Sequence, residues 1–252
     1  MRLTNKKAIV TGGAGGIGRA SSLALAAEGA SVAVVDLNIE AAEGVAAEIR
    51  EAGGVALAVA ADVSDEQDIE RVVATVLAEF GGVDVVFNNA GIIRRTTAVE
   101  TTVEEWDRVF GVNVRSIFLM CKHVVPVMES AGGGSIINTG SGWGLKGGGR
   151  ALSYCASKGA VVNMTRALAI DHGPAGIRVN SVNPGDVNTG MLRDEARQLA
   201  QDTNSFLAEA ADRPLRRMGE PEEVAQAVVW LASDESSYVT GSAMVVDGGG
   251  IA

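Results

Sequence analysis

Apolar residues fall in short runs that alternate with longer mixed segments along the chain. Several of the short runs, such as residues 32–35 and 83–87, are almost entirely apolar. This pattern is typical of parallel strands whose sheet is covered on both faces. The runs predict strands at residues 6–11, 31–36, 55–61, 83–88, 135–139, 178–183 and 243–246.

The segments between these runs repeat their apolar positions about every 3.6 residues, as an amphipathic helix does. They predict helices at residues 16–28, 39–52, 66–80, 102–130, 154–172 and 221–233. Start signals support three of them. Ser64 with Gln67 and Thr101 with Glu104 match the capping-box pattern, and Pro221 with two following glutamates is typical of a first turn.

Alternation of strands and helices predicts a doubly wound α/β fold, with one parallel sheet of about seven strands and helices on both faces. No linker or repeat interrupts residues 1–252, so we expect a single Rossmann-like domain. Residues 186–216 break the rhythm because they are polar, helical in pattern and without a strand. We interpret this segment as a lid over a site at the strand ends.

Composition narrows the classes of function. A net charge of −10 argues against nucleic-acid binding. No apolar run approaches the ~18 residues of a membrane helix, and two cysteines are too few for a disulfide framework, so a cytoplasmic protein is expected. His123 and His172 have no Cys or carboxylate cluster at ligand spacing, so no metal site is predicted.

A glycine-rich turn, "TGGAGGIGRA", follows the first predicted strand. Glycines let a backbone approach a pyrophosphate, and the helix amino terminus favours its negative charge. The spacing fits two registers, Gly13-x-Gly15-x-x-Gly18 and Gly12-x-x-x-Gly16-x-Gly18. The turn therefore predicts a dinucleotide site without choosing between them.

Asp36 ends the second predicted strand, 18 residues after Gly18. A carboxylate there can accept hydrogen bonds from a ribose 2′-hydroxyl and would repel a 2′-phosphate. Residues 12–18 contain no lysine or arginine to attract that phosphate. Both features favour NAD over NADP, although Asp36 could instead cap a helix. Asp62 and Val63 end the third strand, where they could border the adenine, and Asp62 could equally be a cap.

Polar residues recur at later strand ends. Asn88, Asn89, Ala90 and Gly91 close the fourth strand, and Ser141 follows the fifth. In open α/β sheets, ligands bind beyond the carboxyl ends of the strands, so these groups should converge.

Tyr154 and Lys158 are spaced to share one face of the following helix. A phenol has a pKa of about 10, roughly three units too high for acid–base work near neutral pH. A neighbouring ammonium would lower it. A surface helix with a scattered cation is the simpler interpretation of this pair by itself.

Together these motifs resemble the short-chain dehydrogenase/reductase (SDR) family over nearly the whole chain. The matching residues are Thr11-Gly12-x-x-x-Gly16-x-Gly18, Asn88-Asn89-Ala90-Gly91, Asn113, Ser141, Tyr154-x-x-x-Lys158, Pro184-Gly185 and the segment from "PLRRMGEPEEV" to "MVVDGG". The resemblance favours the register of Gly12, Gly16 and Gly18.

The resemblance also implies roles. Tyr154 would be the general acid/base, Lys158 would lower its pKa and bind the nicotinamide ribose, Ser141 would hold the substrate oxygen, and Asn113 would anchor a water. Cofactor contacts are expected from Gly12, Gly16, Ile17, Gly18, Asp36, Leu37, Asp62, Val63, Asn89, Ala90, Gly91, Tyr154, Lys158, Pro184, Gly185, Val187 and Thr189. The cofactor would be NAD, and the protein a homotetramer whose apolar tail packs across an interface.

The substrate is less constrained. Arg94, Arg95 and Arg150 could bind a carboxylate at the pocket mouth, or could simply be solvated. Trp143 could shape the pocket beside Ser141 and Tyr154, or pack elsewhere. The first hypothesis is an NAD-dependent dehydrogenase of a polyol, sugar or sugar acid, since the arginines also look like those of SDR enzymes acting on gluconate-type acids.

Three alternatives stay open. A 3-oxoacyl-[acyl-carrier-protein] reductase shares the motifs, but Asp36 and the net charge count against it. A reductase of cyclic or aromatic ketones would use an apolar pocket of Trp143, Met191 and Leu192. A cofactor-binding regulator without turnover is disfavoured, because Ser141, Tyr154 and Lys158 are all present.

Overall fold

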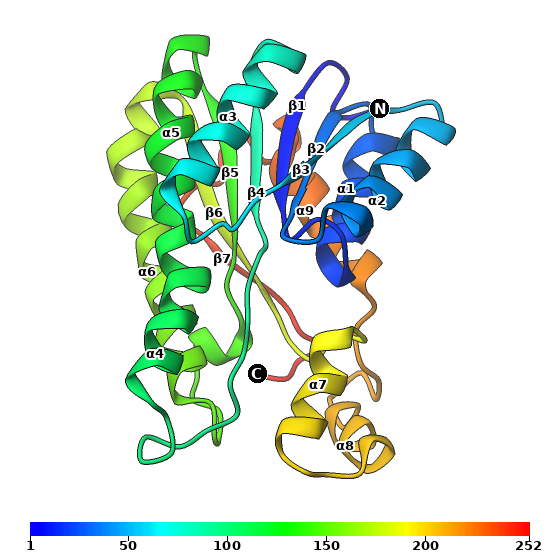
Figure 1. Cartoon of the computed structure of the whole chain (residues 1–252), viewed down its shortest axis with the longest axis vertical. Coiled ribbons are helices and arrows are strands. Elements are labelled where there is room, and N and C mark those ends of the chain that lie inside the picture. The colour runs from blue at the N-terminus through cyan, green and yellow to red at the C-terminus, as the bar shows by residue number, and fades with distance from the viewer.

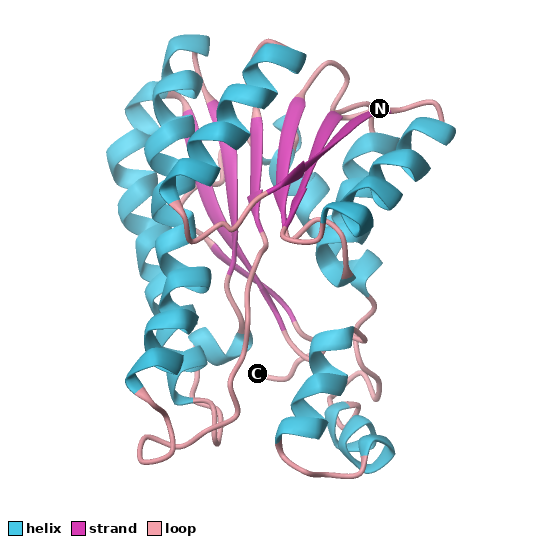
Figure 2. Cartoon of the chain, viewed as in Figure 1, coloured by secondary structure: helices cyan, strands magenta, loops and turns pink.

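A single parallel sheet of seven strands runs through the computed structural model, which describes residues 1–252 (Figures 1 and 2). The strand order is β3-β2-β1-β4-β5-β6-β7, and every pairing is parallel. The strands are β1 Lys7–Thr11, β2 Ser31–Asp36, β3 Val55–Ala60, β4 Val85–Asn88, β5 Gly134–Thr139, β6 Ile177–Pro184 and β7 Ala243–Val246. The predicted fold class and all seven strands are confirmed.

Helices cover both faces of this sheet (Figure 2). Their bounds are α1 Gly16–Ala27, α2 Ile39–Glu51, α3 Glu66–Phe80, α4 Val103–Phe110, α5 Ser116–Ala131, α6 Leu152–His172, α7 Gly190–Gln198, α8 Thr203–Ala210 and α9 Pro221–Ala232. None of them is both long and apolar enough to cross a membrane.

Alternate residues of each strand enter opposite cores. On β1, Ile9 belongs to the core beneath α3, α5 and α6, whereas Ala8 and Val10 belong to the core beneath α1, α2 and α9. Burial on both faces explains why these strands read as continuous apolar runs. The sheet is therefore fixed from both sides, and its strand ends form a rigid edge.

The long helix predicted at residues 102–130 is wrong in detail. The structure has α4, a π-helical turn at Gly111–Arg115, and then α5. A π-turn inserts one extra residue and shifts the apolar pattern only slightly, so the pattern does not reveal it. Such turns are frequent at functional sites, and this one carries Asn113.

Both predicted capping boxes are also misplaced. Asp65, not Ser64, caps α3 by accepting from the backbone N–H groups of Gln67 and Asp68. The box of α4 pairs Thr102 with Glu105, one residue later than predicted. In each case an adjacent residue offers an equivalent capping oxygen, so the choice depends on the path of the incoming loop.

The strand order reverses at β1, which pairs with β2 on one side and with β4 on the other. Such a reversal opens a crevice beyond the carboxyl ends of the strands. The segment predicted as a lid forms α7 and α8 beyond this edge (yellow in Figure 1). A bridge between Val187 and Gly219 ties its two ends together.

Candidate active site

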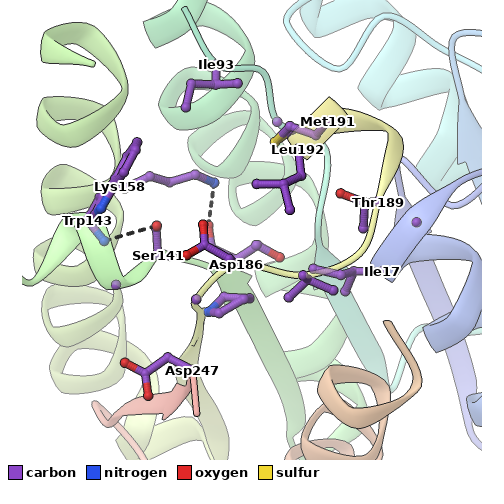
Figure 3. A pocket seen from close by; sticks show the side chains of 18 of the residues that line it. Ile17, Ile93, Ser141, Trp143, Lys158, Asp186, Thr189, Met191, Leu192 and Asp247 are labelled. Atoms are coloured by element: carbon purple, nitrogen blue, oxygen red, sulfur yellow. Dashed lines mark hydrogen bonds between the residues drawn. The ribbon is translucent and has the colours of Figure 1, made fainter. Parts of the chain in front are cut away.

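A cavity of about 390 Å³ lies beyond the carboxyl ends of the strands. Residues of the glycine turn, the ends of β4, β5 and β6, helix α7 and the last residues of the chain line it. Figure 3 shows Lys158 and Trp143 on one side, Met191 and Leu192 on the other, and Ser141 between them. One cavity thus unites motifs that lie more than a hundred residues apart.

The glycine turn disfavours a side chain at several positions, including the three that the resemblance singled out. Gly12 and Gly16 have φ of 59° and 49°, which favour glycine. A Cβ on Gly18 would lie 1.9 Å from the carbonyl oxygen of Gly12. A Cβ on Gly15, by contrast, would meet nothing within 4 Å. The geometry therefore requires glycine at positions 12, 16 and 18, as the resemblance indicated.

Thr11 and Asn89 join the glycine turn to the end of β4. The Thr11 hydroxyl accepts from the backbone N–H groups of Asn89 and Ala90, at 3.0 and 3.2 Å. The Asn89 amide donates to the carbonyls of Thr11 and Gly12, both at 3.1 Å. Asn89, Ala90 and Gly91 line the cavity. These hydrogen bonds therefore hold the backbone at the ends of β1 and β4 in a fixed position along one wall of the cavity.

Asp36 lies beside the same turn. Its carboxylate accepts from the backbone N–H groups of Ala14 and Asn38, each at 3.1 Å. The cap of α2 is Asn38, which accepts from Ala41, so the alternative that Asp36 caps this helix is wrong. Arg19 of α1 is paired with Glu48 at 2.5 Å.

The other residues predicted to contact the cofactor divide into two groups. Ile17, Pro184, Gly185, Val187 and Thr189 line the cavity. Gly18 lies in α1 against Gly12, outside the lining, and Asp36, Leu37, Asp62 and Val63 lie outside it at the carboxyl ends of β2 and β3. Asp62 accepts from the backbone N–H and hydroxyl of Ser64, so it closes the turn after β3.

Ser141, Tyr154 and Lys158 all line the cavity. The Ser141 hydroxyl accepts from the backbone N–H of Trp143 at 3.1 Å, which leaves its own proton free to be donated. Lys158 is buried, and its ammonium donates to the carbonyl of Thr139 at 2.6 Å. Its nitrogen lies 5.7 Å from the centroid of the Tyr154 ring.

The pKa of Tyr154 shifts against expectation. Burial raises the pKa of this phenol to about 12, and the neighbouring Ser141 hydroxyl only partly opposes it. Burial also lowers the pKa of Lys158 to about 8. The predicted lowering of the phenol pKa by Lys158 is therefore not seen in this chain alone, because desolvation of the phenolate dominates and the ammonium is directed at Thr139.

Asn113 lies in the π-helical turn, fully buried behind Lys158. Its side-chain oxygen accepts from the backbone N–H of Ile92 at 2.8 Å. Its amide donates to the Ile92 carbonyl and to the Ser157 hydroxyl. Asn113 thus fixes the loop after β4 against α6, and it does not line the cavity. The predicted water next to Asn113 stays a prediction.

The substrate side of the cavity is mainly apolar. Ile93, Trp143, Met191, Leu192 and Ile251 line it. Trp143 meets Tyr154 edge to face, with ring centroids 6.3 Å apart. Trp143 therefore forms part of the pocket, as one of the two interpretations predicted.

The arginines predicted to bind a carboxylate are not available for it. Arg95 pairs with Glu195 at 2.7 Å, Arg150 with Glu100 at 3.1 Å, and Arg94 lies 4.0 Å from Glu105. None of the three lines the cavity. The prediction that they face a substrate was wrong. Two of their three partners, Glu195 and Glu100, lie 100 and 50 residues away in the sequence, so local spacing does not reveal them.

Several lining residues escaped the sequence analysis. They are Glu195, Asp186, Arg213, Lys146, Asp247, Gly250 and Ile251. Asp186 pairs with Arg213, and Asp247 accepts from the backbone N–H groups of Gly249 and Ile251. Of these residues, only Glu195 could have been found from the sequence. It follows Met191 by one helical turn within the predicted lid, so the two side chains should share one helix face. The apolar tail lines this chain's own cavity.

Comparison with known proteins agrees with this geometry. The sequence model of a family described as "Enoyl-(Acyl carrier protein) reductase" matches residues 12–250. The chain is 44% identical over 248 residues to cyclopentanol dehydrogenase of Comamonas sp., covering 98% of each protein. It is 40% identical over 250 residues to cyclohexanol dehydrogenase of Acinetobacter sp., covering 98% of this chain and 95% of that protein. The crystal structure of levodione reductase is similar at 37% identity and a TM-score of 0.95, over 98% of each chain.

Proposed function

Since the chain belongs to the short-chain dehydrogenase/reductase family and is an oxidoreductase acting on CH–OH groups, we propose that it interconverts a neutral, cyclic secondary alcohol and its ketone with NAD. The observation that carries the proposal is the composition of the substrate side. Ile93, Trp143, Met191 and Leu192 share the cavity with Ser141 and Tyr154. Of the two cations in the lining, Arg213 pairs with Asp186, and Lys146 donates to the carbonyl of Gly250 near the end of the chain. Such a wall favours an apolar ring over a sugar acid. The relatives that act on cyclopentanol and cyclohexanol support this class.

The proposed proton transfer uses two hydroxyl groups. In alcohol oxidation the Tyr154 phenolate takes the substrate hydroxyl proton, and in ketone reduction the phenol returns it. Ser141 donates a hydrogen bond to the substrate oxygen, on which negative charge develops as the reaction proceeds. NAD, when bound, supplies the hydride acceptor and a positive charge that favours the phenolate.

Lys158 and Asn113 support this pair. The Lys158 ammonium, released from Thr139, can hold hydroxyl groups of the nicotinamide ribose and add positive charge beside Tyr154. Asn113 holds Ile92 and Ser157, and thereby positions the loop and the helix between which Lys158 lies. We propose Asn113 as a positioning residue that also anchors a water on the proton path.

The glycine turn fits a dinucleotide. Gly12, Gly16 and Gly18 keep side chains away from the start of α1, where the helix dipole favours phosphate. Asn89, Ala90, Gly91, Pro184, Gly185, Val187 and Thr189 would hold the nicotinamide half, and Ile17 would border it. Asp36, Leu37, Asp62 and Val63 would hold the adenosine half.

Charge around Asp36 supports NAD over NADP. Asp36 would accept hydrogen bonds from the ribose 2′-hydroxyl and repel a phosphate in that place. Arg19 pairs with Glu48, and residues 12–18 contain no lysine or arginine. The Asp36→Asn variant should raise kcat/KM with NADP relative to NAD by about tenfold. An unchanged ratio would contradict the role of Asp36.

The activity is tested by an absorbance screen at the nicotinamide band. NAD and NADP are offered separately with cyclopentanol, cyclohexanol, acyclic secondary alcohols, polyols and sugar acids, and the reduced cofactors with ketones and a β-ketoacyl thioester. We expect the highest kcat/KM for cyclic alcohols with NAD. A preference for sugar acids would restore the arginine hypothesis. A preference for the thioester with NADPH would favour a 3-oxoacyl-[acyl-carrier-protein] reductase.

We also propose that the protein is a homotetramer. Three elements expose a large apolar side chain. They are α5 with Phe118, α6 with Ile170 and β7 with Val245, whose exposed fractions are 54%, 75% and 39%. Self-association would cover them. Light scattering tests the proposal, and a monomeric mass at micromolar concentration would overturn it.

A further inference from the structure

Glu195 is the one carboxylate that helix α7 presents to the substrate side of the cavity. It is 7% exposed, lines the cavity, and shares it with Ile93, Trp143 and Leu192. A charged group in such apolar surroundings is uncommon and needs partners to offset its lost hydration. The hydrogen-bond partners of the Glu195 carboxylate therefore indicate its role.

Arg95 satisfies one side of this carboxylate. Its Nη1 donates to Oε2 of Glu195 at 2.7 Å, and both side chains are 10% exposed. The guanidinium also donates to the carbonyl of Gly149 and lies 4.9 Å from the centroid of the Trp143 ring. Because Arg95 is fixed on three sides, it holds the Glu195 carboxylate in one orientation.

The second oxygen of Glu195 has no such partner. Oε1 accepts no hydrogen bond from any group of the protein, although an ionised carboxylate can accept about four. Burial raises the pKa of Glu195 even though Arg95 opposes the shift, which shows how poorly the carboxylate is solvated. A donor brought by a ligand would relieve this deficit.

The Trp143 ring joins Arg95, the partner of Glu195, to the phenol of Tyr154. This ring contacts Tyr154 on one side and Arg95 on the other. Glu195, Ser141 and Tyr154 line the same cavity, and besides burial the negative charge of Glu195 contributes to the raised pKa of Tyr154. A small ring that lies along the indole would therefore extend from Tyr154 and Ser141 toward Glu195. A substrate hydroxyl at the far side of that ring could then donate to Oε1.

We propose that Glu195 determines specificity by accepting a hydrogen bond from a second hydroxyl of the substrate. The preferred substrates are then cyclic diols and the corresponding hydroxy ketones, one carbon of which reacts at Tyr154 while the other hydroxyl is held by Glu195. This inference rests on the proposed function, since it assumes turnover of a cyclic alcohol.

The test compares substrates with and without the second donor. Values of kcat/KM with NAD are measured for cyclohexanol, for the 1,2-, 1,3- and 1,4-cyclohexanediols, and for the monomethyl ether of the best diol. The enzymes are wild type, Glu195→Gln and, as a matched control, Glu209→Gln on the exposed face of α8. In Glu195→Gln the single amide oxygen stays with Arg95, so an NH₂ that cannot accept faces the cavity.

We expect wild type to prefer one diol over both cyclohexanol and the methyl ether by about tenfold or more, as for one hydrogen bond to a charged group. Glu195→Gln should lose this preference, so that its kcat/KM falls about tenfold more for the diol than for cyclohexanol. Glu209→Gln should behave as wild type. This pattern would identify Glu195 as the acceptor.

Other outcomes overturn the inference in distinct ways. If Glu195→Gln lowers kcat/KM for diol and cyclohexanol in parallel, Glu195 only holds the lid in place. If wild type prefers no diol, or does not distinguish a diol from its methyl ether, the oxygen receives no substrate hydroxyl, whatever the stability of the variant. If wild type oxidises no cyclic alcohol with NAD, the proposed function itself fails.

Discussion

The cavity has two walls that are built in different ways. The glycine-loop wall, residues 11–18 and 88–91, consists mainly of backbone laced by Thr11 and Asn89 at the ends of two central strands. The lid wall, residues 186–216, consists mainly of side chains on two short helices; the Val187–Gly219 bridge closes the segment, and the Arg95–Glu195 pair joins it to the loop after β4. A bound molecule therefore meets fixed geometry on one side and side-chain chemistry on the other.

This difference separates the cofactor-binding features that the family shares from the substrate-binding side chains that are particular to this chain. The glycine-loop wall offers N–H groups and a helix start, which suit any dinucleotide. The lid wall offers Met191, Leu192 and Glu195, which suit particular substrates. Substitutions in the two walls should accordingly fail in different ways.

The largest effect is expected where the walls meet. Tyr154→Phe removes the proton carrier but keeps the ring beside Trp143, so kcat/KM should fall on the order of 10³-fold while NAD affinity changes little. Steady-state kinetics and NAD titration measure the two. Tyr238→Phe is the control, because Tyr238 is fully exposed and far from the cavity lining. Retention of a tenth of the activity in Tyr154→Phe would remove it from the proton path.

A large loss of stability is expected at the anchor of the lid wall. Arg95→Ala leaves Glu195 buried without its cation and should lower the free energy of unfolding by about 3 kcal/mol. Arg150→Ala breaks a pair whose side chains are 50% and 45% exposed, so it should change stability by less than about 1 kcal/mol. Urea denaturation measures both. Equal effects would mean that the buried pair does not hold the lid.

The pH dependence of stability tests the burial of Lys158. Burial lowers its pKa from 10.5 to about 8. Between these two pH values the unfolded chain keeps a proton that the folded chain has lost, so stability rises with pH across this window. Wild type should gain up to about 3 kcal/mol relative to Lys158→Met between pH 8 and 10.5. Denaturation curves of both proteins at several pH values give this difference, and a flat difference would mean that Lys158 is well hydrated.

A smaller effect should come from the same substitution in each wall. Gly18→Ala places a Cβ against the Gly12 carbonyl and should cost about 1–3 kcal/mol, together with weaker NAD binding. Gly190→Ala meets open space at the start of α7 and should leave stability unchanged or raise it by about 0.5–1 kcal/mol. Thermal unfolding and NAD titration compare them. If Gly18→Ala keeps the stability and NAD affinity of wild type, the backbone of the glycine-loop wall can shift to accommodate a methyl group.

The sequence analysis succeeded where constraints are local. All seven strands and the residues of the glycine-loop wall follow from patterns within ten or twenty residues, because parallel strands are buried on both faces and the turn excludes a Cβ. The π-helical turn and the exact helix caps were missed, since each depends on a shift of a single residue.

Predictions about the lid wall were weaker because its chemistry depends on partners far apart in sequence. Arg95 was expected at the pocket mouth, yet it pairs with Glu195, a hundred residues later. Tyr154 and Lys158 were correctly placed together in the cavity, but the direction of the phenol pKa depends on burial, which no local spacing reveals.

The last residues of the chain have a practical consequence. Ile251 lines the cavity, and the carboxylate of Asp247 fixes its backbone. An affinity tag fused after Ala252 would start two residues after Ile251, beside the cavity, and would crowd it. Met1 is 87% exposed near the opposite edge of the sheet (Figure 1). Purification through an amino-terminal tag is therefore the safer choice for every kinetic measurement described above.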